Sequence, residues 1–423
     1  MKTSYIDCHC HIFNKDVLIN NATILRLLTT LPDILISDKA VDKKYNKIEG
    51  NKTTIENIVN FLKTGLQASE ASLFNEMDAV YAYDYAIVPL MFDLEECFNA
   101  ANPDTGKSFI QDLLEKAIHS ITEIIDAFKD DSNKDTGLLE ELKSLLQPHV
   151  DNKMPTNGFE DQITQLTALK QANPDKIYPF FAIDPRREGV VERFKTEIAE
   201  KGTFTGVKLY PPNGYSPTDK VFIDSDFYGF CAQKGIPIIT HNSFGGFASL
   251  LDKIHINGDI YDETSGITYV DKDVDFVSIT KGFDNMVLDK GTKLNHPKLW
   301  RTVLEKHNDL KLDLAHFGHG NDKWQTEIYN MLCEKKDNGD LKFPNLYVDL
   351  SCYTEKDQLK LVKEKFYDKA PEAVKRKFLY GSDFYLNLLT IDSLSTYLKQ
   401  FKDVFGDDFP RIALHNPKVF LNL

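Results

Sequence analysis

The first stretch with residues able to do chemistry is YIDCHCHIFN, in which Asp7, His9 and His11 alternate with Cys8 and Cys10. Successive side chains of a β-strand point to opposite faces, so we expect both histidines on one face and both cysteines on the other, toward the helices. Imidazole is a common Zn²⁺ ligand, whereas the Cys8-x-Cys10 spacing is too tight for a zinc knuckle or a thioredoxin-type pair. The histidines are therefore the predicted metal ligands, and Asp7 is a predicted hydrogen-bond partner deeper on the same face.

Three more residues of ligand type each end a predicted strand: His241 in ITHN, His316 in LAHF and Asp383 in GSDF. Taken singly, each has an ordinary structural explanation, since strand histidines are often only packed and GSD can cap a helix. Together with the histidine pair they place ligand types at four of the eight predicted strand ends. This joint pattern favours a site for a divalent ion, with Zn²⁺ first and Mn²⁺ or Fe²⁺ as alternatives.

Short β-rich runs alternate with longer amphipathic helical segments along the chain. The near-continuous apolar character of these runs is typical of parallel strands covered on both faces, and parallel strands need crossover connections, usually helices. The sequence thus predicts an α/β fold, a (β/α)8 TIM barrel, whose functional side chains gather at the C-terminal ends of the strands. The predicted strands are residues 3–9, 84–90, 176–184, 204–211, 236–242, 310–317, 345–351 and 377–383.

We expect one domain spanning residues 1–423, with three insertions near 14–65, 95–175 and 243–295. The first two follow strands one and two and have helical periodicity, with Ile and Leu three and four residues apart. The third follows strand five and is polar and rich in Gly and Asp. We expect it to be a long loop over the C-terminal mouth of the barrel, as a lid or a substrate-shaping loop.

The composition is that of an acidic globular protein, with 50 Lys and Arg against 64 Asp and Glu and a formal net charge of -14. This balance argues against nucleic acid and anionic membranes as partners, because both favour basic patches. There is no secretory signal pattern or run of membrane-span length, and six cysteines give no disulfide framework. We therefore expect a cytoplasmic enzyme with a small-molecule partner, and the sequence leaves assembly into a homo-oligomer open.

The stretches IDCHCHIFN, GVKLYPPNGYSP, GIPIITHNS, LKLDLAHFGHG and FLYGSDF resemble the amidohydrolase superfamily. The branch they resemble most is the amidohydrolase-related group that includes aminocarboxymuconate-semialdehyde decarboxylase. The resemblance covers the barrel strands and not the insertions. It implies that His9, His11, His241 and Asp383 ligate the metal, and that His316 is a catalytic acid/base and substrate-orienting residue or the ligand of a second metal.

Lys208 ends the fourth strand in GVKLYPPN, between apolar pairs that indicate burial. In binuclear relatives such as dihydroorotases, a lysine at this place is carbamylated and bridges two metals, which would leave His241 and His316 to hold the second ion. In mononuclear decarboxylase-type relatives no such bridge forms. The resemblance favours one ion, with Lys208 as a buried cation for a substrate carboxylate or oxyanion.

Three other residues are candidates for substrate binding. Arg186, which ends the third strand in AIDPRRE, has the geometry to clamp a carboxylate bidentately, although an exposed salt bridge is an equally good explanation. Tyr210 and Asn213 follow Lys208 closely and would line the pocket, unless PPNG is only a turn.

Two functions fit this predicted site. The first is a metal-dependent hydrolase that uses a metal-bound water to cleave a C–N or C–O bond in a small carbonyl substrate, with Asp383 moving the proton and His316 stabilising the oxyanion. The alternative is a metal-dependent, non-oxidative decarboxylase, a carbon–carbon lyase acting on an unsaturated or aromatic carboxylic acid that Arg186 or Lys208 would hold. The hydrolase is favoured, because KLYPPN also resembles hydrolytic members of the superfamily.

Overall fold

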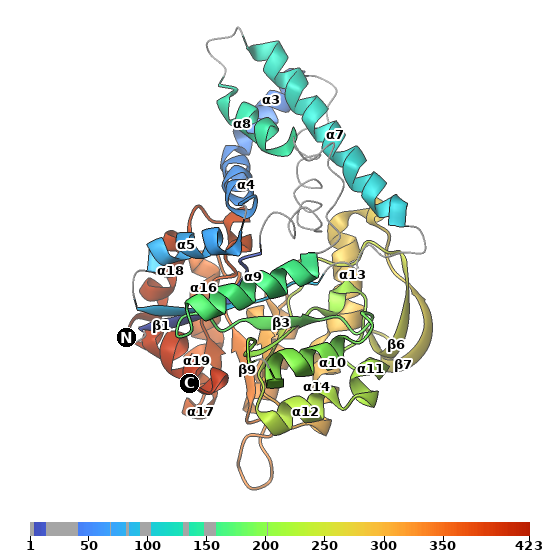
Figure 1. Cartoon of the computed structure of the whole chain (residues 1–423), viewed down its shortest axis with the longest axis vertical. Coiled ribbons are helices and arrows are strands. Elements are labelled where there is room, and N and C mark those ends of the chain that lie inside the picture. Colours follow the sequence, from blue (N-terminus) through green and yellow to red (C-terminus); the bar gives the residue numbers. More distant parts are fainter. Residues whose placement is uncertain are drawn as a thin grey trace.

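A ring of parallel strands forms the centre of the chain (Figure 1). The computed structural model describes residues 4–13, 41–67, 69–81, 84–93, 103–129, 135–147, 158–200 and 202–423. Within these residues the barrel strands are β1 (Tyr5–Cys10), β2 (Tyr85–Pro89), β3 (Phe180–Ile183), β4 (Gly206–Leu209), β5 (Ile238–His241), β8 (Leu312–Ala315), β9 (Leu346–Asp349) and β10 (Phe378–Leu379). One sheet has the order β10-β9-β8-β5-β4-β3, and β1 pairs with β2 in parallel. Parallel bridges from Leu90 to Phe180 and from Cys10 to Phe384 close the ring, which confirms the predicted TIM barrel.

Helices cover the outside of this ring, as the amphipathic segments predict. They are α5 (Glu70–Tyr81), α9 (Gly158–Ala172), α10 (Val190–Lys195), α11 (Lys220–Asp224), α12 (Phe227–Lys234), α14 (Pro297–Lys306), α15 (Asp322–Cys333), α16 (Lys356–Val362), α17 (Glu372–Lys375), α18 (Leu394–Phe405) and α19 (Asn416–Leu421). In the described part of the chain, no helix combines the length and the apolar character needed to cross a membrane.

The barrel interior is a packed core rather than a channel. Side chains from seven of the strands or their ends meet there, namely Ile6, Cys8, Ala86, Val88, Leu90, Phe180, Ile239, Ala315, Tyr347 and Leu379. Gly206 leaves room for the ring of Phe180, because a Cβ at this position would lie 2.5 Å from the Cζ atom of Phe180. This apolar layer forms the floor on which the polar residues at the strand ends rest.

A β-bulge in β1 overturns part of the predicted alternation. Asp7 pairs with Ile87 and Cys10 with Pro89, so β1 uses three residues where β2 uses two. Cys8 therefore joins the barrel interior, whereas Cys10 packs in the outer core, and the prediction that both cysteines face the helices is wrong for Cys8. Asp7 accepts hydrogen bonds from the Tyr81 hydroxyl of α5 at 2.7 Å and from Ser382, so it supports the strand from the outer side and not from the histidine face.

The helical insertions are present as predicted. Helices α3 (Val41–Gly50), α4 (Lys52–Gly65), α7 (Pro103–Phe128) and α8 (Gly137–Leu146) form a group that projects above the barrel (Figure 1). Helix α8 packs on α4 and α7, and α3 packs on α7. Residues 14–40 of the first insertion and residues 94–102, 130–134 and 148–157 of the second lie outside the described residues.

The third insertion is not the long loop that the sequence predicts. It contains an antiparallel hairpin of β6 (Lys253–Asp262) and β7 (Gly266–Asp275), followed by α13 (Phe283–Asn295). Ile254 and Ile256 alternate with exposed neighbours and pack with Val270, Val274 and Leu294 in a small separate core. The hairpin stands on the flank of the barrel in Figure 1, so this alternation marks a one-sided sheet and not a lid.

Candidate metal centre

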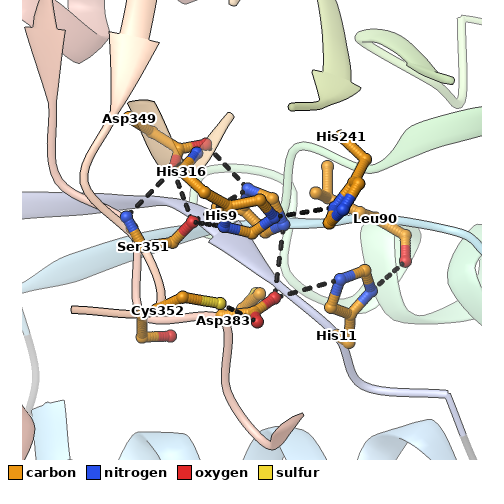
Figure 2. A network of polar contacts seen from close by, with 12 residues as sticks. His9, His11, Leu90, His241, His316, Asp349, Ser351, Cys352 and Asp383 are labelled. Carbon is orange, nitrogen blue, oxygen red and sulfur yellow. Dashed lines mark hydrogen bonds and ion pairs between the residues drawn. The ribbon is translucent and has the colours of Figure 1, made fainter. Parts of the chain in front are cut away.

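Six of the predicted site residues converge at the C-terminal end of the barrel. They come from five strands or the short segments after them, and all six are buried: His9, His11, Lys208, His241, His316 and Asp383. Figure 2 labels the five other than Lys208. The apolar runs of the strands place these polar groups, because only the strand ends leave the packed interior and reach the cavity above it.

His9, His11 and Asp383 form one group of possible metal ligands. One oxygen of Asp383, Oδ1, lies 3.3 Å from Nε2 of His9 and 3.3 Å from Nε2 of His11. His9 Nδ1 lies 2.7 Å from Oδ2 of Asp349, and His11 Nδ1 lies 3.1 Å from the carbonyl oxygen of Leu90. Because a carboxylate and a carbonyl only accept, each Nδ1 carries a ring proton, and in a neutral ring each Nε2 then points a lone pair toward Asp383. Two imidazole nitrogens and a carboxylate oxygen converge in this way, which is the donor set of a cation site.

A second pair of histidines is arranged in the same way. His241 Nε2 donates to the carbonyl of Gly245 at 2.9 Å, so its Nδ1 is unprotonated. His316 Nδ1 lies 2.7 Å from the Ser351 hydroxyl, which itself must donate to the Asp349 carboxylate. His316 Nδ1 therefore donates, and the bare Nε2 faces His241 Nδ1 at 3.1 Å. Burial lowers the pKa of His316 to about 3, so the ring is neutral near pH 7.

Asp349 and Ser351 are site residues that the sequence prediction misses, although both lie in a correctly predicted strand. Asp349 accepts hydrogen bonds from His9, from the backbone N–H of His316 at 3.0 Å and from the backbone N–H of Ser351 at 2.9 Å. Burial alone would raise the pKa of Asp349, but His9 at 2.7 Å holds it well below its ordinary range. A carboxylate behind a ligand histidine fixes the ring orientation and makes the ligand atom more basic. An acidic residue inside the apolar run LYVDL is the sequence signal for it.

These donor sets fit a divalent ion. In the described part of the chain, His9, His11 and Asp383 each offer a ligand atom within 4.8 Å of the others, and all three are buried. His241 does not belong to this group and lies beside His316 instead. Nitrogen and carboxylate oxygen in this combination suit Zn²⁺ and also Mn²⁺ or Fe²⁺.

Lys208 is buried, as its apolar neighbours predict, and its Nζ lies 3.3 Å from Nε2 of His9. Burial lowers the pKa of Lys208 to about 8, against the pull of Asp383 and Asp349, whose carboxylates raise it. A lysine in this position holds a positive charge at the edge of the donor group. It also lies in the wall of the cavity that opens above the site.

This cavity has a volume of about 610 Å³. Its floor includes His11, Lys208, His241, His316 and Asp383, and its apolar wall includes Phe92, Tyr210 and Phe247. Thr53, Thr54, Asn57 and Ile58 of α4 form another side, so the first insertion does help to shape the cavity. Of the third insertion, Ser243 and residues 245–247 reach it.

The predicted substrate-binding residues separate into two groups. Tyr210 lines the cavity, and its ring stacks on His241 with the centroids 4.3 Å apart. Arg186 instead pairs with Asp184, through Nε to Oδ1 at 2.9 Å and Nη2 to Oδ2 at 2.5 Å, and donates to the carbonyl of Asn213 at 3.0 Å. Asn213 Nδ2 donates to the carbonyl of Asp93. Among the described residues, neither Arg186 nor Asn213 lines the cavity, because these local contacts hold both in the adjoining loops.

Comparisons with known proteins agree with this geometry. The family model described as amidohydrolase matches residues 6–422. A structure of a 5-carboxyvanillate decarboxylase variant from Novosphingobium aromaticivorans, solved with manganese and 3-methoxy-4-hydroxy-5-nitrobenzoic acid, is 11% identical, with a TM-score of 0.50 and coverage of 100% of each chain. An uncharacterised TIM-barrel protein from Bordetella bronchiseptica is 14% identical, with a TM-score of 0.48 and coverage of 99% of this chain and 98% of the other.

A 2,6-dihydroxybenzoate decarboxylase from Rhizobium is 12% identical, with a TM-score of 0.46 and coverage of 100% of this chain and 99% of the other. At 11% identity, the likeness to the Novosphingobium structure shows the fold alone. No curated protein matches the chain. The family match, in contrast, spans nearly the whole sequence and includes all six converging residues. This chain therefore belongs to the amidohydrolase family of metal-dependent enzymes.

Proposed function

We propose that this chain is a metal-dependent hydrolase that cleaves a C–N or C–O bond in a small carbonyl substrate. The observation that carries the proposal is the convergence of donor atoms from His9, His11 and Asp383, of which His11 and Asp383 line the cavity. A divalent ion held by these residues and His241 supplies Lewis acidity, which polarises a carbonyl oxygen and activates water. Zn²⁺, Mn²⁺ and Fe²⁺ are all compatible with these ligands.

Asp383 is the residue we assign to proton transfer. Its carboxylate lies at the cavity floor and accepts the proton of the attacking water, then passes it to the leaving nitrogen or oxygen. Its Oδ2 takes a hydrogen bond from the Cys352 thiol at 2.7 Å, which keeps the carboxylate in one orientation.

His316 and Lys208 are assigned to the substrate. Both line the cavity, His316 as a neutral ring and Lys208 as a buried amine. Lys208 attracts a carboxylate or the developing oxyanion, and His316 orients the carbonyl group opposite Asp383. One ion suffices for this chemistry. A carbamylated Lys208 would instead bridge two ions, and intact-mass and metal analysis of the same sample separates the two states.

A second candidate, decarboxylation of an unsaturated or aromatic acid, is favoured by the aromatic wall of the cavity. Phe92 lies edge-on to Tyr210, with ring centroids 4.8 Å apart, and 6.0 Å from Phe247. Such a wall suits a flat ring, with Lys208 available for its carboxylate. The solved decarboxylases named above act on substrates of this kind.

Isotope labelling separates the two reactions. The purified, metal-analysed enzyme is incubated with small lactones, amides and aromatic or unsaturated acids in H₂¹⁸O and, separately, in D₂O. Hydrolysis places one ¹⁸O atom in the product acid, whereas decarboxylation releases CO₂ and places deuterium on carbon. Release of CO₂ with no ¹⁸O incorporation would refute the hydrolase proposal. A protein that binds no divalent ion when purified and reloaded would refute both candidates.

A further inference from the structure

A second group of possible metal ligands lies next to the first. His316, Cys352 and Asp383 each offer a ligand atom within 4.8 Å of the others. All three line the cavity, and they follow three neighbouring strands, β8, β9 and β10. The group adds a sulfur atom to a site that otherwise offers nitrogen and oxygen. Sulfur is the donor that thiophilic ions such as Zn²⁺ prefer.

The carboxylate of Asp383 is oriented toward both groups at once. Oδ1 faces the Nε2 atoms of His9 and His11 at 3.3 Å, while Oδ2 faces the Cys352 sulfur at 2.7 Å (Figure 2). A carboxylate with one oxygen on each side is able to bridge two ions. His316 also has a bare Nε2, because its Nδ1 proton is held by Ser351.

The backbone at these three residues is unusual in the same way. His316, Cys352 and Asp383 have φ values of 65°, 67° and 56°, which is the left-handed region that non-glycine residues avoid. His9 and His11 do not share this feature. Such conformations cluster at active sites and ligand clamps. Three neighbouring strand ends therefore each accept strain at the residue that supplies a donor.

We propose that His316, Cys352 and Asp383 bind a second, thiophilic divalent ion, with the Asp383 carboxylate bridging it to the ion held by His9 and His11. The inference rests on the proposed function for the first ion and leaves Lys208 as a free amine. Binding replaces the Cys352 thiol proton by the ion and releases that proton to solvent. The thiolate then supplies the negative charge that a carbamylated lysine supplies in a bridged pair.

The test compares the full-length wild type with Cys352→Ala, Cys352→Ser and Lys208→Met. Cys333→Ser is the matched control, because Cys333 is also a partly exposed free cysteine but lies at the end of α15. Each protein is stripped of metal, reloaded with Zn²⁺ and measured for ions per chain, and its folding is checked by circular dichroism. Cd²⁺ is then titrated while the near-ultraviolet thiolate-to-metal absorption is recorded.

We expect two zinc ions per chain in the wild type, Cys333→Ser and Lys208→Met, and one in both Cys352 variants. The thiolate absorption appears in the wild type and is absent from Cys352→Ser. Equal zinc content in the wild type and both Cys352 variants, without a thiolate band, overturns the second site while leaving the first ion intact. Loss of one ion in Lys208→Met but not in Cys352→Ala also overturns it, in favour of a carbamate bridge. No zinc in the wild type refutes the proposed function and this inference together.

Discussion

Replacing Asp349 by asparagine removes the charge behind a proposed metal ligand while keeping the shape of the side chain. The carboxylate accepts from His9 Nδ1 at 2.7 Å, from the His316 backbone at 3.0 Å and from the Ser351 backbone at 2.9 Å. Asparagine has one acceptor oxygen, so at least one of these donors then faces an NH₂ group. We expect His9 to lose its fixed orientation and part of its basicity.

The expected size of the effect follows from these contacts. Outer partners of metal ligands contribute about 10–100-fold to metal affinity, so the dissociation constant for Zn²⁺ rises by that factor. Hydrogen bonds to a charged group are worth about 1 kcal/mol more than neutral ones, so three weakened bonds cost about 3 kcal/mol of unfolding free energy in the metal-free protein. The two effects are measured by competition with a zinc-binding dye and by urea unfolding.

Asp313→Asn is the matched control. Asp313 is a buried carboxyl in the neighbouring strand β8, and in the described structure no hydrogen bond joins it to a histidine ring. Burial and the neighbouring Asp349 carboxylate raise the pKa of Asp313 well above its ordinary value. We expect this variant to bind zinc with nearly wild-type affinity. A wild-type zinc affinity in Asp349→Asn would refute the role assigned to Asp349. An equal loss of zinc affinity in both variants would show that the loss comes from general damage to the barrel and not from this role.

Three further predictions test other parts of the structure. We expect His241→Ala to lose metal and activity, whereas His316→Ala keeps the ion at His9 and loses turnover. Metal analysis and activity assays of both variants check this prediction, and full turnover in His316→Ala would contradict it. Gly381→Ala places a Cβ atom 2.6 Å from the Cβ atom of His9. We therefore expect the zinc affinity, measured by dye competition, to fall while the circular dichroism spectrum stays unchanged. A wild-type zinc affinity would count against this close packing. Burial raises the pKa of Asp219, which caps α11, from 3.8 to about 6. The protonated carboxyl therefore stabilises the folded protein below pH 4, and this contribution is lost as the pH rises through about 6. Asp219→Asn keeps the helix cap and, after allowing for solvent screening, stabilises the protein by about 1–2 kcal/mol at pH 7.5. Thermal unfolding at pH 7.5 and at pH 4 should show that this gain in stability disappears at the lower pH.

The sequence was sufficient for the barrel and for the convergence of its polar residues, because both depend on strong periodic signals. Apolar runs predict parallel strands, and the parallel arrangement itself brings His241, His316 and Asp383 to one end. Two features needed information that a single sequence does not carry. The bulge that turns Cys8 inward depends on pairing between β1 and β2, which strand periodicity alone cannot reveal. Arg186 was predicted from its position at a strand end, but the competing carboxylate of Asp184 two residues away holds it in place.

Asp349 and Cys352 were missed for a different reason. The local sequence marks Asp349 only as an acidic residue in an apolar run and gives no signal for Cys352. The roles of these residues depend on His9 and Asp383, which are distant in the chain but adjacent in the closed barrel. The hairpin of the third insertion was not predicted because most of its outer face is polar. The alternate spacing of Ile254 and Ile256 is the sequence pattern of its buried face.

Helix α4 adds a wall to the cavity, so the residues that would select the substrate lie on a different segment from those that would carry out the reaction. The donor groups belong to barrel strands whose positions are fixed by a packed interior, while Thr53, Thr54, Asn57 and Ile58 come from an inserted segment. The sequence of that helix, or the whole insertion, can therefore change without moving the proposed metal ligands. A library restricted to these four positions would explore new substrates on an unchanged reaction centre, and relatives with other insertions would be expected to share the chemistry and differ in what they accept.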